Sequence, residues 1–121
     1  MIIKRNNIRE IAYNSGNIEK YKSSDNLLRH ARYIPGRTQG IMLVDNRNNL
    51  VGYIAWEKDY IIALEVTEKY RHQGIATSLL KSCPAKPLTV AKDNIPAINL
   101  YKSLGWKKSR NLGRMIKMIK R

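Results

Sequence analysis

The sequence predicts an α/β fold in which helices cover a mixed β-sheet. Two observations carry this prediction. Short apolar runs rich in β-branched residues are bounded by turn residues, and segments with helical spacing stand between them. The resulting order is helices, a hairpin, a third strand, a helix, a strand, a helix and a final pair of strands. Because the 121 residues contain no repeat, linker or low-complexity tract, we expect a single domain over residues 1–121.

The first third of the chain predicts a short strand and two helices. Residues 1–5 suit a strand, and the spacing of apolar and small side chains over residues 8–15 predicts a helix that Gly16 ends. A second helix is expected over residues 27–32, because a Ser-Asp pair can cap its start and Pro35 cannot continue it.

The middle of the chain predicts a hairpin, a strand and a helix. Residues 40–46 and 49–57 are β-rich runs on either side of an Asn-rich turn, which is typical of an antiparallel hairpin. A third strand is expected over residues 60–66. A helix should then run from about Gly74 to Cys83, because apolar side chains recur there at helical spacing and a proline follows.

The last third predicts a strand over residues 87–92 and then a helix. Pro96 can occupy the first turn of that helix, and Gly105 can cap its end. Residues 106–112 and 114–121 are expected to form one or two final strands. The spacing of the apolar side chains in the second of these segments also suits a helical turn, and that alternative stays open.

Composition excludes several classes of protein. The longest apolar run, near residues 60–64, is far shorter than the roughly 20 residues of a membrane span, and the N-terminus lacks the features of a secretory signal, so we expect a cytoplasmic protein. Cys83 is the only cysteine, so no internal disulfide can form. With only His30 and His72 beside it, the sequence has no metal-ligand spacing and predicts no metal site.

The charge is strongly positive and uneven along the chain. There are 23 Lys and Arg residues against 9 Asp and Glu, which gives a net charge of +14. Residues 94–121 carry eight basic side chains and no acidic one. Such a surface attracts phosphates and acidic partners and repels cations. The alternative is a surface that serves solubility alone.

The most specific segment joins the third strand to the following helix. It reads Arg71-x-x-Gly74-x-Ala76, and its small residues allow a ligand to approach the backbone closely. The free amides and the dipole of the helix start can then bind a pyrophosphate, with Lys69 and Arg71 adding positive charge. The alternative is that Gly74 only begins a helix after a turn.

This segment resembles the Q/R-x-x-G-x-G/A signature of the GCN5-related N-acetyltransferases, the GNAT family. A second block that resembles the family consists of Val90, Asn94, Ala97, Leu100, Tyr101, Gly105 and Trp106. The hairpin over residues 49–56 is similar to the segment that precedes the signature, so the resemblance covers roughly residues 38–120. Ala76 stands where a second glycine is commoner, which the family pattern allows.

The resemblance implies a mixed, mostly antiparallel central sheet with helices on both faces and a splayed strand pair that forms an acetyl-CoA cleft. Acetyl-CoA would be the cosubstrate. Its pantetheine arm would pair with the backbone of residues 64–66, its pyrophosphate would lie on the amides of residues 71–76, and its thioester would lie near Asn94. The implied contacts are Leu64, Glu65, Val66, Arg71, His72, Gln73, Gly74, Ile75, Ala76, Thr77, Asn94, Asn99, Tyr101 and Lys102.

Acetyl transfer to an amine needs a neutral nucleophile, a polarised thioester carbonyl and a proton for the leaving thiolate. Tyr101 matches the family's general acid, and its ordinary pKa near 10 suits a proton donor to a thiolate. The alternative is an aromatic side chain of the core. A backbone amide at a strand bulge near residues 64–66 is expected to polarise the carbonyl.

The general base is less well defined by the sequence. Glu57, Asp59 and Glu65 are the carboxylates on or beside the central strands. Glu65 and Glu57 are taken as catalytic candidates, although solvated carboxylates are the alternative. An enzyme without a strong base suits an α-amine, because about a tenth to a fifth of an α-amine is neutral at pH 7, against about 0.04% of a lysine amine. Cys83 lacks the neighbours of a nucleophile.

Two functions follow from these observations. The first is an acetyl-CoA-dependent N-acetyltransferase that acts on a primary amine, and the basic C-terminal half favours an amine carried by an anionic body, such as a nucleic acid or an acidic protein N-terminus. The second is a catalytically silent protein of the same fold that binds nucleic acid or regulates. We expect Trp56 and Trp106 in the core rather than stacked on bases. No membrane partner is expected, and a homodimer is allowed.

Overall fold

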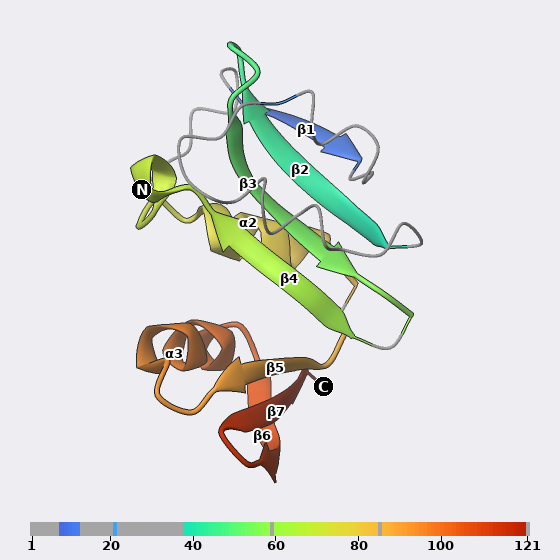
Figure 1. Ribbon diagram of the computed structural model, residues 1–121, viewed down its shortest axis with the longest axis vertical. Coiled ribbons are helices and arrows are strands. Elements are labelled where there is room, and N and C mark those ends of the chain that lie inside the picture. Colours follow the sequence, from blue (N-terminus) through green and yellow to red (C-terminus); the bar gives the residue numbers. More distant parts are fainter. Residues whose placement is uncertain (1–7, 13–20, 22–37, 59, 85, 121) are drawn as a thin grey trace.

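The computed structural model describes residues 8–12, 21, 38–58, 60–84 and 86–120, and in them the chain forms two antiparallel sheets (Figure 1). The first sheet, in the order β1-β2-β3-β4, consists of β1 (Ile8–Ala12), β2 (Gln39–Asp45), β3 (Leu50–Trp56) and β4 (Ile61–Val66). The second, in the order β5-β7-β6, consists of β5 (Leu88–Ala91), β6 (Trp106–Leu112) and β7 (Met115–Lys120). The described helices are η3 (Glu68–Tyr70), α2 (Ile75–Ser82) and α3 (Ile95–Ser103).

The prediction of a helix over residues 8–15 is wrong for residues 8–12, which form strand β1 and pair with β2. The apolar spacing that suggested a helix has another cause. Ile8 packs against the larger hydrophobic core, whereas Ile11 packs against a smaller one. Residues three apart in a strand point to opposite faces, so one strand serves both cores. The strand expected over residues 1–5 and the helix over residues 27–32 lie outside the described residues.

The predicted hairpin is confirmed as β2 and β3, and the predicted third strand as β4. Strand β3 is buried along its whole length because it is covered on both faces. Its Gly52 is required by close packing: a Cβ there would lie 2.8 Å from the carbonyl oxygen of Glu65 and 3.3 Å from Cγ2 of Ile75. The glycine therefore allows the first turn of α2 to rest directly on the sheet.

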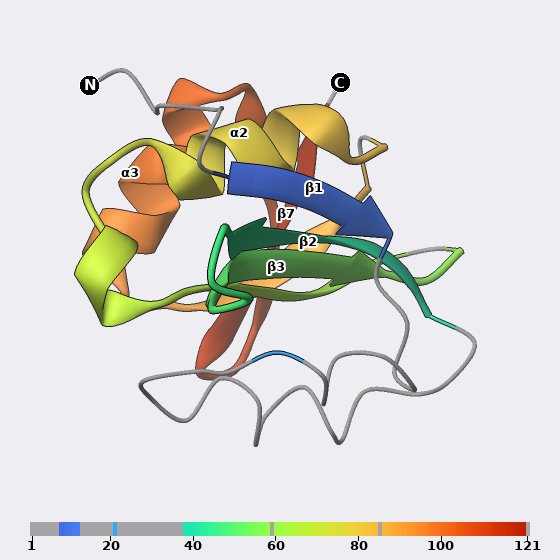
Figure 2. The same ribbon diagram turned by 90° about the horizontal axis from the view of Figure 1, so that it is seen from above.

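Helices α2 and α3 lie on one side of the first sheet (Figure 2). Ile75, Leu79 and Leu80 of α2 pack in the larger core with side chains of β3 and of the second sheet. Helix α3 begins at the N-cap Asn94 and is followed by Gly105, whose φ of 103° suits a residue without a side chain. In the described residues, no helix is long and apolar enough to cross a membrane.

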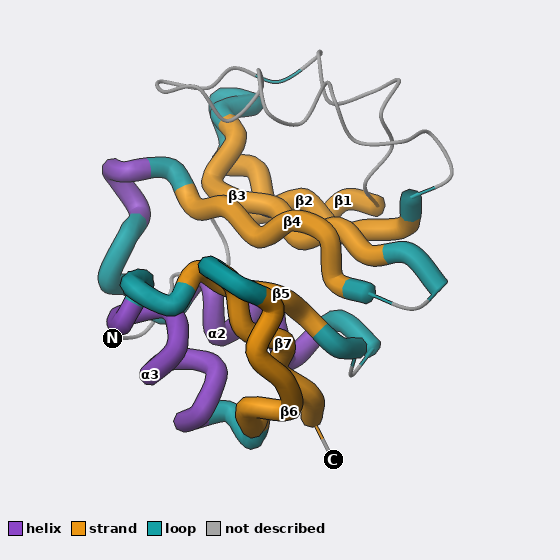
Figure 3. Tube along the Cα trace, turned by 60° about the horizontal axis from the view of Figure 1, so that its bottom comes forward, coloured by secondary structure: helices purple, strands orange, loops and turns teal. Residues whose placement is uncertain are grey.

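The two sheets separate between β4 and β5 (Figure 3). Strands β4 and β5 run in the same direction, and the chain passes from one to the other through helix α2 (Figure 1). Near their starts they are linked by a hydrogen bond of 2.8 Å, in which the amide of Ile61 donates to the carbonyl of Pro87. Toward their ends they diverge. The final segment forms strands β6 and β7, so the helical alternative for residues 114–121 is wrong.

Candidate active site

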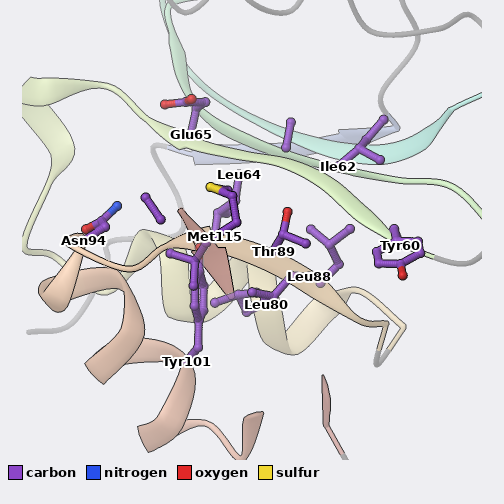
Figure 4. Close-up of a pocket in the computed structure, with 14 residues that line it drawn as sticks. Tyr60, Ile62, Leu64, Glu65, Leu80, Leu88, Thr89, Asn94, Tyr101 and Met115 are labelled. Atoms are coloured by element: carbon purple, nitrogen blue, oxygen red, sulfur yellow. The ribbon is translucent and has the colours of Figure 1, made fainter. Parts of the chain in front are cut away.

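A cavity of about 630 Å³ lies where β4 and β5 diverge (Figure 4). It is lined by side chains of both strands and by residues of α2, α3 and β7. These residues are Tyr60, Ile61, Ile62, Ala63, Leu64, Glu65, Leu80, Leu88, Thr89, Val90, Ala91, Asn94, Tyr101 and Met115. We call it the strand cavity. Among the predicted site residues, it brings together Leu64, Glu65, Asn94 and Tyr101.

The edge of β4 offers backbone groups to this cavity. The amide of Thr67 donates a hydrogen bond of 2.9 Å to the carbonyl of Val51, so the backbone N–H and C=O groups of Thr67 point toward β3. Backbone direction alternates along a strand, and therefore the N–H and C=O groups of Val66 and Leu64 point away from β3, while those of Glu65 point toward it. The Nε of Arg71 donates 3.0 Å to the carbonyl of Val66, which fits this direction. Leu64 and Val66 can thus pair with an extended ligand.

The strand bulge lies elsewhere than the sequence suggested. The register between β3 and β4 shifts where Ala55 pairs with Ala63 and Trp56 pairs with Ile61, so Ile62 is the extra residue. The expectation of a bulge near residues 64–66 is wrong. Residues 64–66 pair regularly with β3, and the bulge interrupts the pairing nearer the start of β4.

Tyr101 reaches the strand cavity from α3 (Figure 4). Burial raises the pKa of its hydroxyl above the ordinary value, and the negative charge of Glu65 raises it further. The ring packs against that of Trp106, with 6.3 Å between the centroids and an angle of 60° between the planes. The hydroxyl is therefore fixed in place and protonated at neutral pH.

The three candidate carboxylates differ in position. Glu65 is half-buried and lines the strand cavity, rising from β4 on the side away from Tyr101 (Figure 4). Glu57 is exposed beside the β3–β4 turn and is absent from the cavity wall, and Asp59 lies outside the described residues. Of the two described candidates, only Glu65 can face a ligand in the cavity.

A second cavity, of about 360 Å³, continues along the same elements. Val66 of β4 and Leu100 of α3 lie in its wall. Their neighbours in the sequence, Glu65 and Tyr101, lie in the wall of the strand cavity. Its wall is made of Val66, Tyr70, Arg71, His72, Gly74, Ile75, Ala76, Thr77, Pro96, Ala97 and Leu100. We call it the loop cavity. The two cavities therefore lie next to each other along β4 and α3.

The loop cavity opens onto the start of α2. His72 and Gly74 both have positive φ, of 62° and 78°, so the backbone curls around the helix start. The N-cap Gly74 provides no side chain to the first-turn amides, and a Cβ there would meet nothing within 4 Å. Free amides at the positive end of a helix dipole, facing open space, are suited to bind a phosphate.

Side chains of the loop are held by its own backbone. Arg71 is anchored at the end of β4 through its bond to Val66, which leaves the terminal nitrogens of an exposed guanidinium beside the loop cavity. Gln73 donates 3.2 Å to the carbonyl of Lys69 and so braces the turn. Arg71 therefore provides positive charge at the cavity, while Gln73 shapes the loop.

The predicted residues of α3 are divided by the phase of the helix. Asn94 lines the strand cavity, and its Oδ1 also accepts a 3.3 Å bond from the amide of Ala97, which caps the helix. Asn99 and Lys102 are exposed and belong to neither cavity wall. The expected contacts of these two residues with a ligand therefore have no support in the cavity walls.

Several lining residues escaped sequence reasoning. Thr89 and Met115 line the strand cavity, and Pro96 and Tyr70 line the loop cavity. Leu88 and Val90 are buried, and Thr89 between them is exposed. Side chains alternate along a strand, so Thr89 points out of the core, but the sequence does not show which strand faces Thr89. Cys83 has a pKa raised by burial, so its thiol is a poor nucleophile, as expected.

Comparisons with known proteins agree with this geometry. Residues 37–108 match the acetyltransferase (GNAT) domain family. An N-alpha-acetyltransferase of Sulfurisphaera tokodaii is 36% identical over 66 residues, which are 46% of this chain and 40% of that protein. The chain therefore spans about two fifths of that relative.

Solved structures share the fold. Arabidopsis thaliana NAA60, in complex with a bisubstrate analogue, superposes with a TM-score of 0.66 at 21% identity and covers 93% of this chain and 94% of its own. The PaiA N-acetyltransferase of Thermoplasma acidophilum, in complex with coenzyme A, gives 0.67 at 15% identity and covers 94% and 98%. With a family match over more than half of its length, this chain belongs to the GNAT acetyltransferase family.

Proposed function

We propose that residues 1–121 act as a single acetyl-CoA-dependent N-acetyltransferase domain, which transfers an acetyl group to a primary amine in a ternary complex. The observation that carries this proposal is the pair of neighbouring cavities along β4 and α3. The first lies at the open backbone edge of β4 beside Tyr101, and the second lies at the uncapped start of α2. This arrangement matches a ligand with a thioester at one end and a pyrophosphate at the other.

The residues present fit acetyl-CoA, which supplies an activated acetyl group as a thioester. In our proposal the amides of the α2 start and the guanidinium of Arg71 hold the pyrophosphate. The outward backbone groups of Leu64 and Val66 hold the extended arm, and Asn94 lies near the thioester. Each contact uses a group that faces a cavity in the described residues.

The chemical step that we propose needs two proton transfers. The neutral amine attacks the acetyl carbon, the carbon–sulfur bond breaks, and Tyr101 gives its proton to the leaving thiolate. Glu65, directly or through a water, takes the proton that the amine loses. The raised pKa of Tyr101 supports the first role because the hydroxyl stays protonated until the thiolate forms.

An α-amine is the acceptor that this site favours. With Glu65 as the one described carboxylate in the cavity wall, the site offers little help in deprotonating a lysine, of which only about 0.04% is neutral at pH 7. The similarity to an N-alpha-acetyltransferase supports the same choice. The cytoplasmic location and the homodimer that the sequence allows stay predictions.

A second candidate function rests on the positive charge. The hairpin of β6 and β7 carries exposed lysines and arginines, and a protein that binds nucleic acid without turnover would use them. The two functions differ in what Tyr101 does. A silent protein has no use for a hydroxyl held in a cavity beside the edge of a strand.

The test combines binding with turnover. Calorimetry should detect acetyl-CoA binding, and mass spectrometry should detect an added acetyl group on the α-amine of a synthetic peptide but little on a lysine side chain. Gly74→Val should abolish binding, because a β-branched side chain is strained at a φ of 78° and would project toward the phosphates. Ser82→Ala, at the far end of α2, is the matched control. Binding without any transfer would favour the silent alternative.

A further inference from the structure

The second sheet has an outer face that is positively charged near the mouth of the strand cavity. Leu88, Val90, Ile116 and Met118 are buried in the larger core, so the residues that alternate with them point the other way. Pairing across the strands then fixes which side chains of β6 share that face. Near the cavity this outer face has Thr89, Lys117 and Arg110 in one row and Ala91, Met115 and Leu112 in the next, and farther away it has Ile119 with Lys107.

The outer face begins at the strand cavity. Thr89, Ala91 and Met115 belong both to the face and to the cavity wall. Figure 4 shows Thr89 and Met115 there. The Nζ of Lys117 lies 5.4 Å from the ring centroid of Tyr60, which also lines the cavity. A ligand that leaves the cavity on this side must therefore pass Lys117 first and then Arg110, with neighbouring strands about 4.8 Å apart.

The face is basic on one row and apolar on the other. None of the strands β5, β6 and β7 contains an Asp or a Glu, so Lys117 and Arg110 meet no carboxylate within their own sheet. In the second row Met115 is 36% exposed and Leu112 is 42% exposed. A surface that pairs cations with exposed apolar side chains fits a ligand that offers both anions and apolar groups.

We propose that this outer face binds an acidic polypeptide whose α-amine enters the strand cavity. The proposal rests on the proposed N-acetyltransferase function and names its acceptor class. An extended peptide advances about 3.3 Å per residue, so carboxylates within its first half-dozen residues reach Lys117 and Arg110. Its apolar side chains on the other side lie along Met115 and Leu112.

A peptide fits this face better than the other occupants. The sugar-phosphate backbone of a nucleic acid presents charged phosphates and polar sugars, and it lacks the aliphatic side chains with which a peptide can cover Met115 and Leu112. A second copy of this chain would bring like charges together, since β6 also carries the exposed Lys107 and Lys108 at the edge of the sheet. Charge complementarity therefore favours an acidic partner.

The experiment compares three ten-residue peptides with a free α-amine and an N-terminal methionine. They differ only at the third and fifth positions, which are aspartate, asparagine or lysine. We expect kcat/KM to fall in that order, with about a tenfold ratio between the first and last peptides at 20 mM salt. Near 300 mM salt the ratio should shrink to about twofold, because screening shortens the reach of the charges.

A charge reversal assigns the effect to the face. Arg110→Glu should lower kcat/KM for the aspartate peptide about three- to tenfold, raise it for the lysine peptide and change it least for the asparagine peptide. Arg110 is exposed, so the variant should fold. Lys81→Glu makes the same change of charge at the exposed end of α2 and should alter none of the three values.

Fluorescence anisotropy of the same labelled peptides, measured with coenzyme A present, separates the two proposals. Preferred binding of the aspartate peptide without turnover would sink the proposed enzyme activity but keep the acidic partner. Equal values for the three peptides, in turnover or in binding, would overturn the inference. So would binding of a 20-nucleotide RNA that depends on Arg110 when the aspartate peptide shows no preference.

Discussion

Tyr101 is the residue whose surroundings say most about chemistry. It is half-buried, it packs on Trp106, and its pKa is raised by burial and by Glu65. A structural tyrosine of the core would bury its hydroxyl against a protein partner, whereas this side chain lines an open cavity. Burial here keeps a proton on the oxygen without closing it off from a ligand.

Tyr101→Phe should therefore leave acetyl-CoA affinity within about twofold and slow transfer by about 10²–10⁴, the range of a general acid. The packing against Trp106 is kept because only the hydroxyl is removed. Single-turnover rates by rapid quench measure the loss. The wild-type rate should also decline only above pH 10, because the raised pKa keeps the hydroxyl protonated up to that point. A variant as fast as the wild type would assign the proton to another group.

At the residue scale, the expectations that rest on a motif agree with the cavity walls better than those for the exposed part of α3. Arg71, Gly74 and Tyr101 belong to motifs, and all three lie in cavity walls. Asn99 and Lys102 were expected there, but the phase of α3 turns them to solvent. Helical phase depends on where the N-cap falls and on which face packs inward, and neither is fixed by the motif alone.

At the scale of elements, a buried carboxylate joins the β2–β3 turn to the loop of the candidate site. Asp45 accepts 2.9 Å bonds from the amides of Arg47 and Asn49 and a 3.0 Å bond from the side chain of Asn49. The hydroxyl of Tyr70, in η3, also donates to it at 3.4 Å. The β2–β3 turn and η3, which leads into the loop before α2, are thus held to one side chain.

Asp45→Asn should destabilise the fold by about 1–2 kcal/mol at pH 7, because the remaining amide oxygen is an uncharged acceptor and the NH2 group cannot accept the bonds made to the second oxygen. Burial raises the pKa of Asp45, but the bonds from Asn49, Arg47 and Tyr70 outweigh it, and the pKa lies below its ordinary value. This stabilisation is complete above about pH 5 and is lost as pH falls below the unfolded value near 3.9. Urea unfolding measured from pH 7 to pH 3 should show the free energies of unfolding of the wild type and of Asp45→Asn converging as the pH falls. A constant difference would contradict the assignment.

The elements themselves were predicted well where their pattern had one explanation. The hairpin, β4, α2 and α3 were all expected from turn residues, capping and periodicity. Strand β1 was missed because Ile8 and Ile11 serve two cores, which imitates helical spacing. A second core on the far side of a sheet arises from tertiary packing, and local periodicity in the sequence does not reveal it.

At the scale of the whole molecule, the two sheets are held together unevenly. They share the larger hydrophobic core on the side of α2, and Ile61 and Pro87 link the starts of β4 and β5. The strand cavity lies between the two strands, and its wall runs from Tyr60 and Leu88 near their starts to Glu65 and Ala91 near their ends. A ligand that pairs with β4 while contacting α3 would fill that gap, so binding and cohesion of the sheets should be linked.

Saturating acetyl-CoA should therefore raise the stability of the whole chain. At 100 times the Kd, linkage predicts about 2.7 kcal/mol, or roughly 8–12 °C in Tm for a chain of this size. Hydrogen exchange should slow most at the amides of Leu64 and Val66, which point into the gap, and less at Glu65, whose amide already faces β3. Gly74→Val should lose both effects at the same ligand concentration. Protection at Glu65 without protection at its two neighbours would mean that the ligand does not pair with the edge of β4.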